Sequence, residues 1–557
     1  MDRTGRTVER LAGWLVAALP ALFLAVFFGF PLFVILSVSF AGQQGPDFSG
    51  FVRLASSAYY RETVVFTLGQ ALLSTLLTLA TALPCAYVFS VYTFPGRRLV
   101  LSLASLPFVL PTLVVALAFQ ALLGRGGLIN DVLQALLHLE RPPLRLDQTL
   151  TIILIAHVFY NFALVLRMVT AFWSGQSVRM EEAARTLGVS GWRLWARVHL
   201  PVLRPVLWAS FLLVFIYTFT SFGVVLVLGG VRFATIEVQI YYQTTAVFNL
   251  PMAAALCVFQ MAVVGVLTAL YVRYERQAQA VTGSLGRAAR RPRSRRERAV
   301  VAITVLGVGL FLCVPLLALV WFSISYAQGS PSIAAYAALL RGDTRLPYHP
   351  LVAVANSLVF AVAALGLSLG LGGAVAAAVM RSPRWGRWLN VVYMLPLGVS
   401  AVTLGLGMLL AFDEPPVNWR AEAWLIPVAH TLVALPLVVR MLLPAARAVP
   451  QPLLDASRTL GAGPYATFRQ VMLPLVRRSV LAAAVFAFNI SVGEFGASAF
   501  LARPETPTLT NAIYRLLGQP RPEVFGQALA LSVVLLLICL AGFAALEWLA
   551  DEKTPRW

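Results

Sequence analysis

The sequence predicts an all-α polytopic membrane protein with about twelve transmembrane helices in two parallel six-helix repeats. Of its 557 residues, 59% are hydrophobic and 12% are charged, about half the charged fraction that a soluble protein carries. The surplus apolar surface must therefore face lipid. The second observation is a short polar motif that occurs twice, 273 residues apart, each time between apolar segments long enough to cross a bilayer.

The individual spans follow from uncharged apolar windows of about 20 residues, the length that crosses a bilayer as a helix. Because the number of spans is even, both termini are expected on one side of the membrane. The spans are expected near residues 14–40, 63–92, 99–123, 148–172, 205–230, 250–272, 299–325, 351–380, 389–412, 423–446, 479–502 and 524–546.

The distribution of arginine indicates which side that is. Basic residues gather in the connections after the second, fourth, sixth and eighth spans, with the densest run at 287–298. The opposite loops carry acids such as Asp413, Glu414, Glu505 and Glu523. Basic loops stay in the cytoplasm, so both termini and both motif copies are expected there. Topology thereby explains the formal net charge of +20, and we expect no binding to nucleic acid.

A basic, Arg/Ser/Gly-rich segment at 273–298 has the composition of a linker between two halves. The first half, 1–272, contains six spans and the motif loop 176–203; the second, 299–557, contains six spans and the loop 449–476. Both halves begin on the same side, so the repeat is parallel and indicates a duplicated, fused gene. Identical residues recur at the same offset: His157 and His430, Arg167 and Arg440, Phe222 and Phe495, and Tyr241 and Tyr514.

Two residue types exclude several functions. Lys553 is the only lysine, so the chain has no P-loop, which needs a lysine to reach the nucleotide phosphates. ATP, if used, must be hydrolysed by another polypeptide. The four cysteines lie in apolar spans without metal-ligand spacing and are typical of small buried hydrophobes. No catalytic residue, metal site or bound cofactor is predicted, and the chain is not expected to be an enzyme.

The repeated motif has a spacing that predicts local structure. Glu182 and Asp455 are expected to start a short helix, where an acid complements the helix dipole. Gly188 and Gly461 are expected to end that helix in a left-handed turn. A second amphipathic stretch follows, and a Leu-Pro pair is then expected to start the next span.

This pattern resembles the Glu-Ala-Ala loop of bacterial ABC importer permeases with the type I membrane-domain fold, and the resemblance covers nearly the whole chain. In that family the loop forms a coupling helix that sits in a groove of the ATPase subunit. The second copy departs from the pattern at Asp455 and Ser457. The resemblance implies ATPase docking by Glu182, Ala183, Ala184, Gly188, Leu200 and Pro201 and by Asp455, Ala456, Ser457, Gly461, Leu473 and Pro474.

The resemblance also implies the function and the partners. The chain is expected to be the permease subunit of an ATP-driven, binding-protein-dependent importer in a bacterial cytoplasmic membrane. Two ABC ATPase subunits carrying ATP and Mg²⁺ are expected inside, and a solute-binding protein outside. The segments from Ser221 to Tyr241 and from Ser491 to Tyr514 are similar to thiamine permeases. Ferric-iron permeases usually have a Lys-Glu-Leu-Pro type segment where this chain has Val492–Phe495, so iron comes second.

Four residues are candidates for the solute pathway: Ser221, Phe222, Glu494 and Phe495. Glu494 interrupts an uncharged span, where an unpaired charge costs roughly 2.5–3.5 kcal/mol on insertion scales. It is therefore expected to face the protein interior or a pore, where a carboxylate attracts a cationic solute and aromatic rings offer it their faces. The alternative is a helix-packing carboxylate paired with a neighbouring hydroxyl or amide.

The two histidines and the class of transporter each admit a second interpretation. His157 and His430 are expected to bond across helices rather than to share a metal. A secondary transporter of the major facilitator type also has twelve spans, parallel halves and a basic linker, but the doubled motif has no place in it. The identity of the solute, whether thiamine, ferric iron, a polyamine or another, is not determined by the sequence.

Overall fold

The computed structural model describes residues 18–42, 45–104, 107, 110–176, 178–230, 232–281, 289–325, 331–381, 386–413, 418–519 and 521–551. The rest of the chain, including the termini, linker residues 282–288 with Arg287, and Glu414, lies outside the described residues. Regular structure in the described part is helical apart from two short antiparallel strands, β1 (Ala41–Gly42) and β2 (Gly45–Pro46). The all-α prediction is therefore confirmed.

The described residues contain eleven helices that are long and apolar enough to cross a membrane, and one bent helix pair that would make a twelfth span. This agrees with the predicted number of about twelve. The helices divide into two compact units. Unit 1 contains 1–47, 248–258 and 324–557, and unit 2 contains 48–247 and 259–323. Each unit thus takes most of one half of the sequence together with the first span of the other half.

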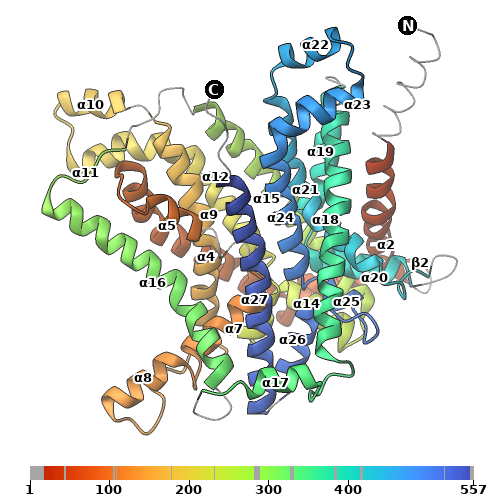
Figure 1. Cartoon of the computed structure of the whole chain (residues 1–557). Coiled ribbons are helices and arrows are strands. Elements are labelled where there is room, and N and C mark those ends of the chain that lie inside the picture. The colour runs from red at the N-terminus through yellow and green to blue at the C-terminus, as the bar shows by residue number, and fades with distance from the viewer. Residues whose placement is uncertain are drawn as a thin grey trace, which may run out of the picture. The chain divides into compact units, whose positions relative to one another are not determined.

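Unit 2 contains the helices of the first half after its first span, followed by the seventh span (Figure 1). In Figure 1, α10 lies at one end of its helices and α8 at the other. Its elements are α3 (Ser49–Ser56), α4 (Ala58–Val91), α5 (Arg97–Leu103), α7 (Thr112–Leu123), α8 (Leu128–Leu137), α9 (Leu150–Ser174), α10 (Val178–Thr186), α11 (Gly191–Leu194), η2 (Trp195–His199), α12 (Leu200–Phe219), α13 (Gly223–Leu228), α14 (Ile236–Thr245), the greater part of α15 (Leu250–Val281) and nearly all of α16 (Arg295–Ser325).

Unit 1 joins the first span to the helices that follow the seventh. Its elements are η1 (Ala25–Gly29), α2 (Phe30–Ser39), α17 (Ala334–Arg341), α18 (Pro350–Arg381), α19 (Gly386–Met394), η3 (Leu395–Gly398), α20 (Ala401–Ala411), α21 (Leu425–Arg447), α22 (Gln451–Thr459), α23 (Pro464–Thr467), η4 (Phe468–Met472), α24 (Leu473–Gly493), α25 (Ser498–Leu501), α26 (Leu509–Leu517) and α27 (Pro522–Asp551).

The exchange of first spans is fixed by packing inside each unit. In unit 1, α2 packs on α20. Gly407 allows this approach, because a Cβ there would lie 3.0 Å from Ile35 Cδ1 and 3.1 Å from Pro31 Cβ. Small residues at such contacts let helices in a membrane come close together. In unit 2, the Phe311 ring of α16 lies 5.6 Å from that of Phe159 on α9.

The expected spans 99–123 and 389–412 are both corrected: the ninth span is bent, and the third candidate span runs over Thr112–Leu137 instead. In the second half, the helices at Val391–Gly398 and Ala401–Ala411 meet at a bend of 99°. Pro396 lies in η3 at this break, and proline cannot donate a backbone hydrogen bond to continue a helix. In the first half, α5 ends at Leu103 and α7 begins directly after Pro111.

The fifth and eleventh spans begin and end earlier than predicted. The sequence predicts them at 205–230 and 479–502, but the helices run over Gly191–Phe219 and Pro464–Gly493. The apolar sequence continues beyond each helix into a short separate helix, α13 or α25. Hydropathy alone does not distinguish such a segment from the end of a span. The correction is the same in both halves, so the break is part of the repeated fold.

Candidate functional site

The two motif loops adopt the same backbone structure. The short helices α10 and α22 each end in a glycine with positive φ, +79° at Gly188 and +82° at Gly461. The residue after each glycine donates its N–H to a carbonyl five residues back, Val189 to Ala184 and Ala462 to Ser457, both at 3.0 Å. This is the Schellman pattern, and the prediction of a left-handed glycine is confirmed in both copies.

The acids of the motif lie inside these helices rather than at their first residue, which corrects the prediction. The helices begin at Val178 and Gln451, four residues before Glu182 and Asp455. Asp455 Oδ1 accepts from Arg458 at 3.2 Å, so this acid pairs within the helix surface. Helix dipole stabilisation falls off after the first turn, so it does not explain the choice of acid at these positions.

The Leu-Pro pair stands at the start of α12 and of α24, as predicted, but each of these helices continues from a further helical turn before it. A π turn, η2 or η4, precedes it in each copy, and Leu200 N–H bonds the carbonyl of Trp195, five residues back. Leu473 bonds Phe468 in the same way. Proline has no N–H and its ring crowds the preceding turn, and the wider π turn accommodates this. Each loop is thus joined to its span by one continuous helix.

The departure of the second copy at Ser457 has a structural partner. Ser457 Oγ lies 2.7 Å from Thr467 Oγ1, and both residues are buried. The equivalent positions in the first copy are Ala184 and Leu194. In both copies the short helix packs on the start of the span helix, α10 on α11 and η2, and α22 on α23 and η4. The second copy thus has a hydroxyl pair at two positions where the first copy has apolar residues.

Both loops expose large apolar side chains at equivalent positions. The exposed fraction is 83% for Leu187 and 87% for Leu460, and 74% for Trp192 and 73% for Tyr465. Trp192 also stacks on Trp195 with ring centroids 5.5 Å apart. Isolated exposed apolar residues are common, but a grouped set indicates an interaction surface. The matched exposure in two copies indicates two equivalent surfaces.

The four pathway candidates lie where the fifth and eleventh span helices stop. Ser221 and Phe222 follow the end of α12, and Glu494 and Phe495 follow the end of α24. Non-helical backbone at membrane depth is tolerated only where it is buried in protein or lines a cavity. Here it is buried: Phe222 and Phe495 are 6% and 3% exposed. Their rings lie 5.5 Å from Tyr241 and 5.3 Å from Tyr514, respectively.

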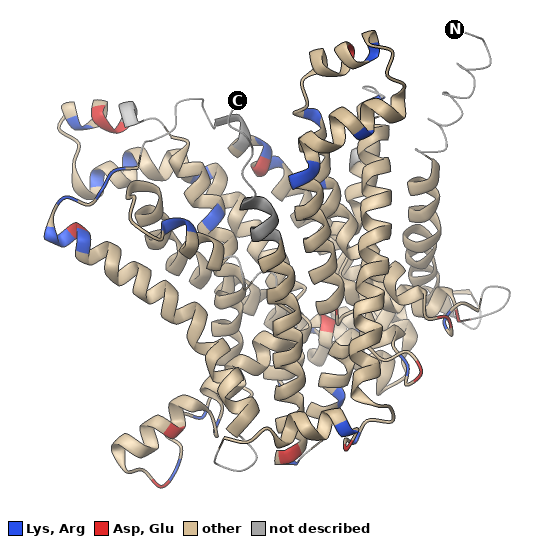
Figure 2. Cartoon of the chain, in the orientation of Figure 1, with Lys and Arg blue, Asp and Glu red and all other residues tan. Residues whose placement is uncertain are grey.

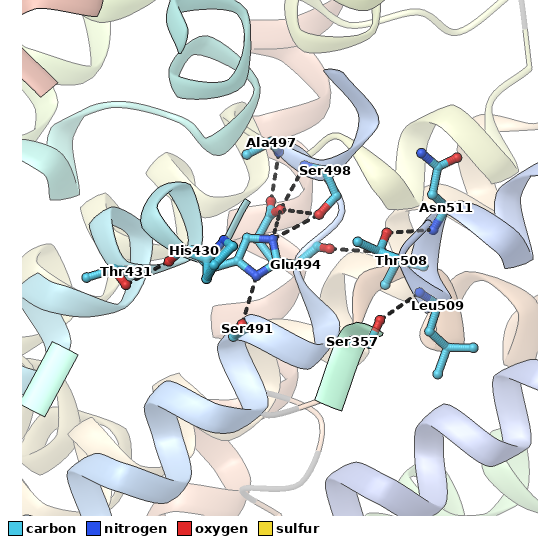
Figure 3. Close-up of polar contacts among 12 residues, drawn as sticks. Ser357, His430, Thr431, Ser491, Glu494, Ala497, Ser498, Thr508, Leu509 and Asn511 are labelled. Atoms are coloured by element: carbon cyan, nitrogen blue, oxygen red, sulfur yellow. Dashed lines mark hydrogen bonds and ion pairs between the residues drawn. The ribbon is translucent and has the colours of Figure 1, made fainter. Parts of the chain in front are cut away.

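His430 of α21 is the centre of the polar cluster in unit 1 (Figure 3). Its Nδ1 lies 2.7 Å from Ser491 Oγ. Its Nε2 lies 2.9 Å from Ser498 Oγ and 3.3 Å from Glu494 Oε2. Figure 3 shows the imidazole between the serine of α24 on one side and the Glu494–Ser498 segment on the other. The histidine therefore fastens the end of the span helix to the segment that folds back.

Glu494 is a paired carboxylate in this structure. Its Oε1 accepts from Ala497 N at 2.9 Å, and its Oε2 accepts from Ser498 N at 3.0 Å and Ser498 Oγ at 3.1 Å. The side chain is 4% exposed. Two of these donors are backbone N–H groups at the start of α25, so the carboxylate caps that helix. This geometry is that of the packing alternative, in which the carboxylate is satisfied by its neighbours.

The equivalent cluster in unit 2 is uncharged. His157 Nδ1 lies 3.0 Å from Ser74 Oγ on α4, and its Nε2 lies 2.9 Å from Ser221 Oγ. Ser221 occupies the position of Glu494 in the repeat. The prediction that the two histidines bond across helices is confirmed. No group of three or more potential metal ligands occurs in the described residues.

The other buried acid of the described residues is Glu237, which is 0% exposed. Gln260 on α15 donates its Nε2–H to Glu237 Oε1. The equivalent residue in unit 1 is Thr510, whose Oγ1 donates to the backbone carbonyl of Glu494 at 2.9 Å. Glu237 is not among the residues that the sequence interpretation selects for the pathway. The signal is nevertheless present, because the residue is a lone acid between apolar segments.

The chain matches the family described as "Binding-protein-dependent transport system inner membrane component" over residues 79–278 and 368–553. The thiamine transport system permease protein ThiP of Brucella abortus is 28% identical over 482 residues, 86% of this chain and 85% of that protein. ThiP of Escherichia coli is 26% identical over 546 residues, 98% of each. The "Probable ABC transporter permease protein y4fN" of Sinorhizobium fredii is 27% identical over 581 residues, 100% of this chain and 99% of that protein.

Among solved structures, the chain resembles a bacterial ABC transporter involved in the import of the acidic polysaccharide alginate. The sequence identity is 18% and the TM-score is 0.41. The match covers 51% of this chain and 100% of that chain.

Proposed function

This chain belongs to the family of binding-protein-dependent transport system inner membrane components and is therefore an ABC importer permease subunit and not an enzyme; on that premise we propose that it conducts thiamine in an ATP-driven importer. Family membership leaves the major facilitator alternative without support. The finer proposal has three parts: where the ATPase subunits bind, on which side of the membrane they bind, and which solute is transported.

The ATPase subunits are proposed to bind at the two motif loops. The observation that carries this proposal is the doubled, rigidly fastened helix with its exposed apolar side chains. The cores of protein interfaces are enriched in aromatic residues, and Trp192 and Tyr465 supply one on each loop, 74% and 73% exposed. The proposed docking residues are Glu182, Ala183, Ala184, Gly188, Leu200, Pro201, Asp455, Ala456, Ser457, Gly461, Leu473 and Pro474.

The loops are proposed to lie in the cytoplasm, together with both termini. Figure 2 marks Lys and Arg residues along the ribbon at the end of unit 2 that carries α10 and the start of α16. An excess of basic residues in short loops marks the cytoplasmic side. Lys553 is the only lysine, so the ATP and its Mg²⁺ are proposed to be held by two separate ATPase subunits. A solute-binding protein is proposed to deliver the solute at the opposite side.

The continuous helices give the loops a mechanical role. Because each loop is fastened onto a helix that runs through the π turn into the span, a displacement of the loop is transmitted along that helix. Closing of the ATPase subunits on ATP is proposed to move both loops, and the units then switch the side on which the pathway is open. Glycine-ended short helices held at two contacts suit such transmission better than flexible loops do.

Thiamine is the favoured solute because several similar proteins over most of the chain are thiamine permeases, and ferric iron is second. Glu494 and Glu237 are buried carboxylates that suit a cationic solute, but Glu494 is paired in this conformation. A pathway role therefore requires its partners to separate during the cycle. Uptake by a Glu494→Gln variant at saturating binding protein tests this: unchanged uptake removes the role.

The docking proposal is tested by co-purification with the ATPase subunit. A Leu187→Glu, Leu460→Glu double variant is expected to lose the ATPase and ATP-dependent uptake. A matched control is Leu136→Glu, an equally apolar leucine that is 70% exposed on α8, at the other end of unit 2 (Figure 1). Normal ATPase binding by the double variant would refute docking at these loops. ATP-independent thiamine uptake in proteoliposomes would refute the proposal that ATP hydrolysis drives transport.

A further inference from the structure

The end of the basic linker is held in place against the end of α4. Arg290 N donates to Val91 O at 3.0 Å, and Thr93 N donates to Arg290 O at 2.9 Å. These two bonds form a parallel bridge between Tyr92 and Arg290. The Arg290 guanidinium lies over the Tyr92 ring, 5.0 Å from its centroid. The described end of the linker is therefore a fixed structural element, whereas its composition predicts a flexible one.

The start of α16 is fixed by a capping box. Glu297 N donates to Ser294 Oγ at 3.1 Å, and the Glu297 carboxylate accepts from Ser294 N at 3.4 Å and Arg293 N at 2.7 Å. Arg290 Nη2 donates to the same carboxylate at 2.6 Å. Glu297 is the only acid in residues 290–298, and its charge is thus matched by Arg290 alone. The remaining arginines of the segment keep their charge available.

These remaining arginines form an exposed basic cluster, which we call the arginine collar. Figure 2 shows it as the basic end of α16. Arg98, in the first turn of α5, is also exposed. The collar consists of Arg291, Arg293, Arg295, Arg296 and Arg298, all of them exposed.

An apolar face continues from the collar along α16. Val300, Ile303, Leu306 and Leu310 are 43%, 70%, 64% and 53% exposed. Their spacing of three and four residues places them on one side of the helix. Arg296 lies seven residues before Ile303 and therefore on the same side. α16 is long and apolar enough to cross a membrane, so this face contacts acyl chains while the collar lies at the level of the headgroups.

We propose that the arginine collar and the exposed face of α16 bind an anionic phospholipid. The arginines hold the headgroup phosphate through charge-assisted hydrogen bonds, and the acyl chain lies along the apolar face. A free phosphate ion would use the arginines and leave the apolar face unused. An acidic protein would need a surface outside the bilayer, whereas the collar leads directly into a lipid-facing helix. Clusters of four to eight basic residues beside a membrane helix favour anionic lipid.

The test is lipid titration of the purified full-length chain in neutral detergent at low salt, with bound lipid counted by native mass spectrometry. Phosphatidylglycerol is compared with phosphatidylcholine. A triple variant, Arg293→Gln, Arg295→Gln and Arg296→Gln, is expected to bind phosphatidylglycerol on the order of a hundredfold more weakly, about fivefold per arginine. The charge-matched control is Arg341→Gln, Arg345→Gln and Arg521→Gln, three exposed arginines of unit 1, and should change the affinity less than about twofold.

Further measurements distinguish the roles of arginine charge, of the lipid headgroup and of correct folding. A triple Arg→Lys variant at the same collar positions keeps the charge and should retain most of the binding. Inorganic phosphate at equal concentration should not displace the lipid. Gel filtration checks that each variant is folded. The proposal is overturned if the triple Gln variant binds phosphatidylglycerol as the wild type does, if both lipids bind equally, or if the unit 1 control loses as much affinity.

Discussion

The polar clusters around His157 and His430 are two copies of one arrangement, but only the second contains a charge. In unit 2 the imidazole joins two hydroxyls, Ser74 and Ser221. In unit 1 the position of Ser221 is taken by Glu494, which also caps α25. Each unit nevertheless buries one acid in its described part, because unit 2 has Glu237 instead.

This difference indicates what duplication preserved. The histidine and the fold-back after the span helix occur in both units, so the fastening of that segment was kept. The buried carboxylate lies at different positions of the repeat in the two units, Glu494 in one and Glu237 in the other. Variants of Glu494 and His430 and of the equivalent residues Ser221 and His157 measure whether the two clusters contribute equally to the free energy of unfolding.

The largest difference in the loss of stability is expected between Glu494→Ala and Ser221→Ala. Removing Glu494 leaves two backbone N–H groups, a serine hydroxyl and His430 without their acceptor, which should lower the free energy of unfolding by about 3–5 kcal/mol. Ser221→Ala removes one hydroxyl partner and should cost about 1–2 kcal/mol. Thermal unfolding of the purified chain in detergent measures both. Equal losses would mean that the two clusters are energetically equivalent despite the charge.

A smaller difference in the loss of stability is expected between His430→Ala and His157→Ala. His430→Ala should cost about 3 kcal/mol, because it leaves a buried carboxylate without the imidazole that lies 3.3 Å from it. His157→Ala leaves only two hydroxyls and should cost about 1–2 kcal/mol. The double variant with Glu494→Ala gives the coupling energy, expected at about 1–3 kcal/mol for groups in direct contact. A coupling near zero would show that the 3.3 Å approach of His430 to Glu494 contributes nothing.

The motif loops allow one copy to be converted toward the other. Ser457→Ala alone leaves the buried Thr467 hydroxyl without its partner and should cost about 1–2 kcal/mol. Adding Thr467→Leu recreates the Ala184 and Leu194 pair of the first copy and should recover most of the loss, since replacing both partners by apolar groups is often nearly neutral. Stability and co-purified ATPase are the readouts. A double variant worse than the single one would contradict the equivalence of the two contacts.

The smallest losses of stability are expected for the glycines that end the two motif helices, and they should be equal in both loops. Gly188→Ala and Gly461→Ala each force a side chain into the left-handed region, at a cost of roughly 1–2 kcal/mol. The control is Gly265→Ala in α15, where a Cβ meets nothing within 4 Å and alanine favours the helix. Stability measurements that show a loss in only one loop would mean that the two Schellman turns do not carry the same strain.

Much of the fold can be predicted from the sequence because hydropathy and duplication are strong signals. The number of spans, the repeated loop and the left-handed glycines are predicted correctly. The bend of the ninth span is not, although Pro396 marks it, because a window of about 20 residues averages over a bend. The later position of the third span, Thr112–Leu137, is also missed, although Pro111 precedes it. The fold-backs at α13 and α25 escape prediction for a related reason, since their residues are as apolar as the spans.

The polar sites can be predicted only in part. Glu494 stands out correctly as an unusual charge and His430 as a residue that bonds across helices, but the sequence does not place residues 64 positions apart in contact. Glu237 carries a signal as a lone acid between apolar segments, but its partner Gln260 lies on another helix and is not predicted. The exchange of first spans leaves no trace in hydropathy. It depends on close packing such as that of Gly407 with Ile35.

That exchange has a consequence for how the protein is made. Helix α2 ends at Ser39, and its packing partner α20 begins at Ala401, so at ~5–20 residues per second the ribosome needs on the order of 20–70 s to deliver the partner. During this interval α2 lacks the helix on which it packs in the finished unit. Unit 1 thus completes its assembly only after α20 is made, when α2 docks beside a helix synthesised much later.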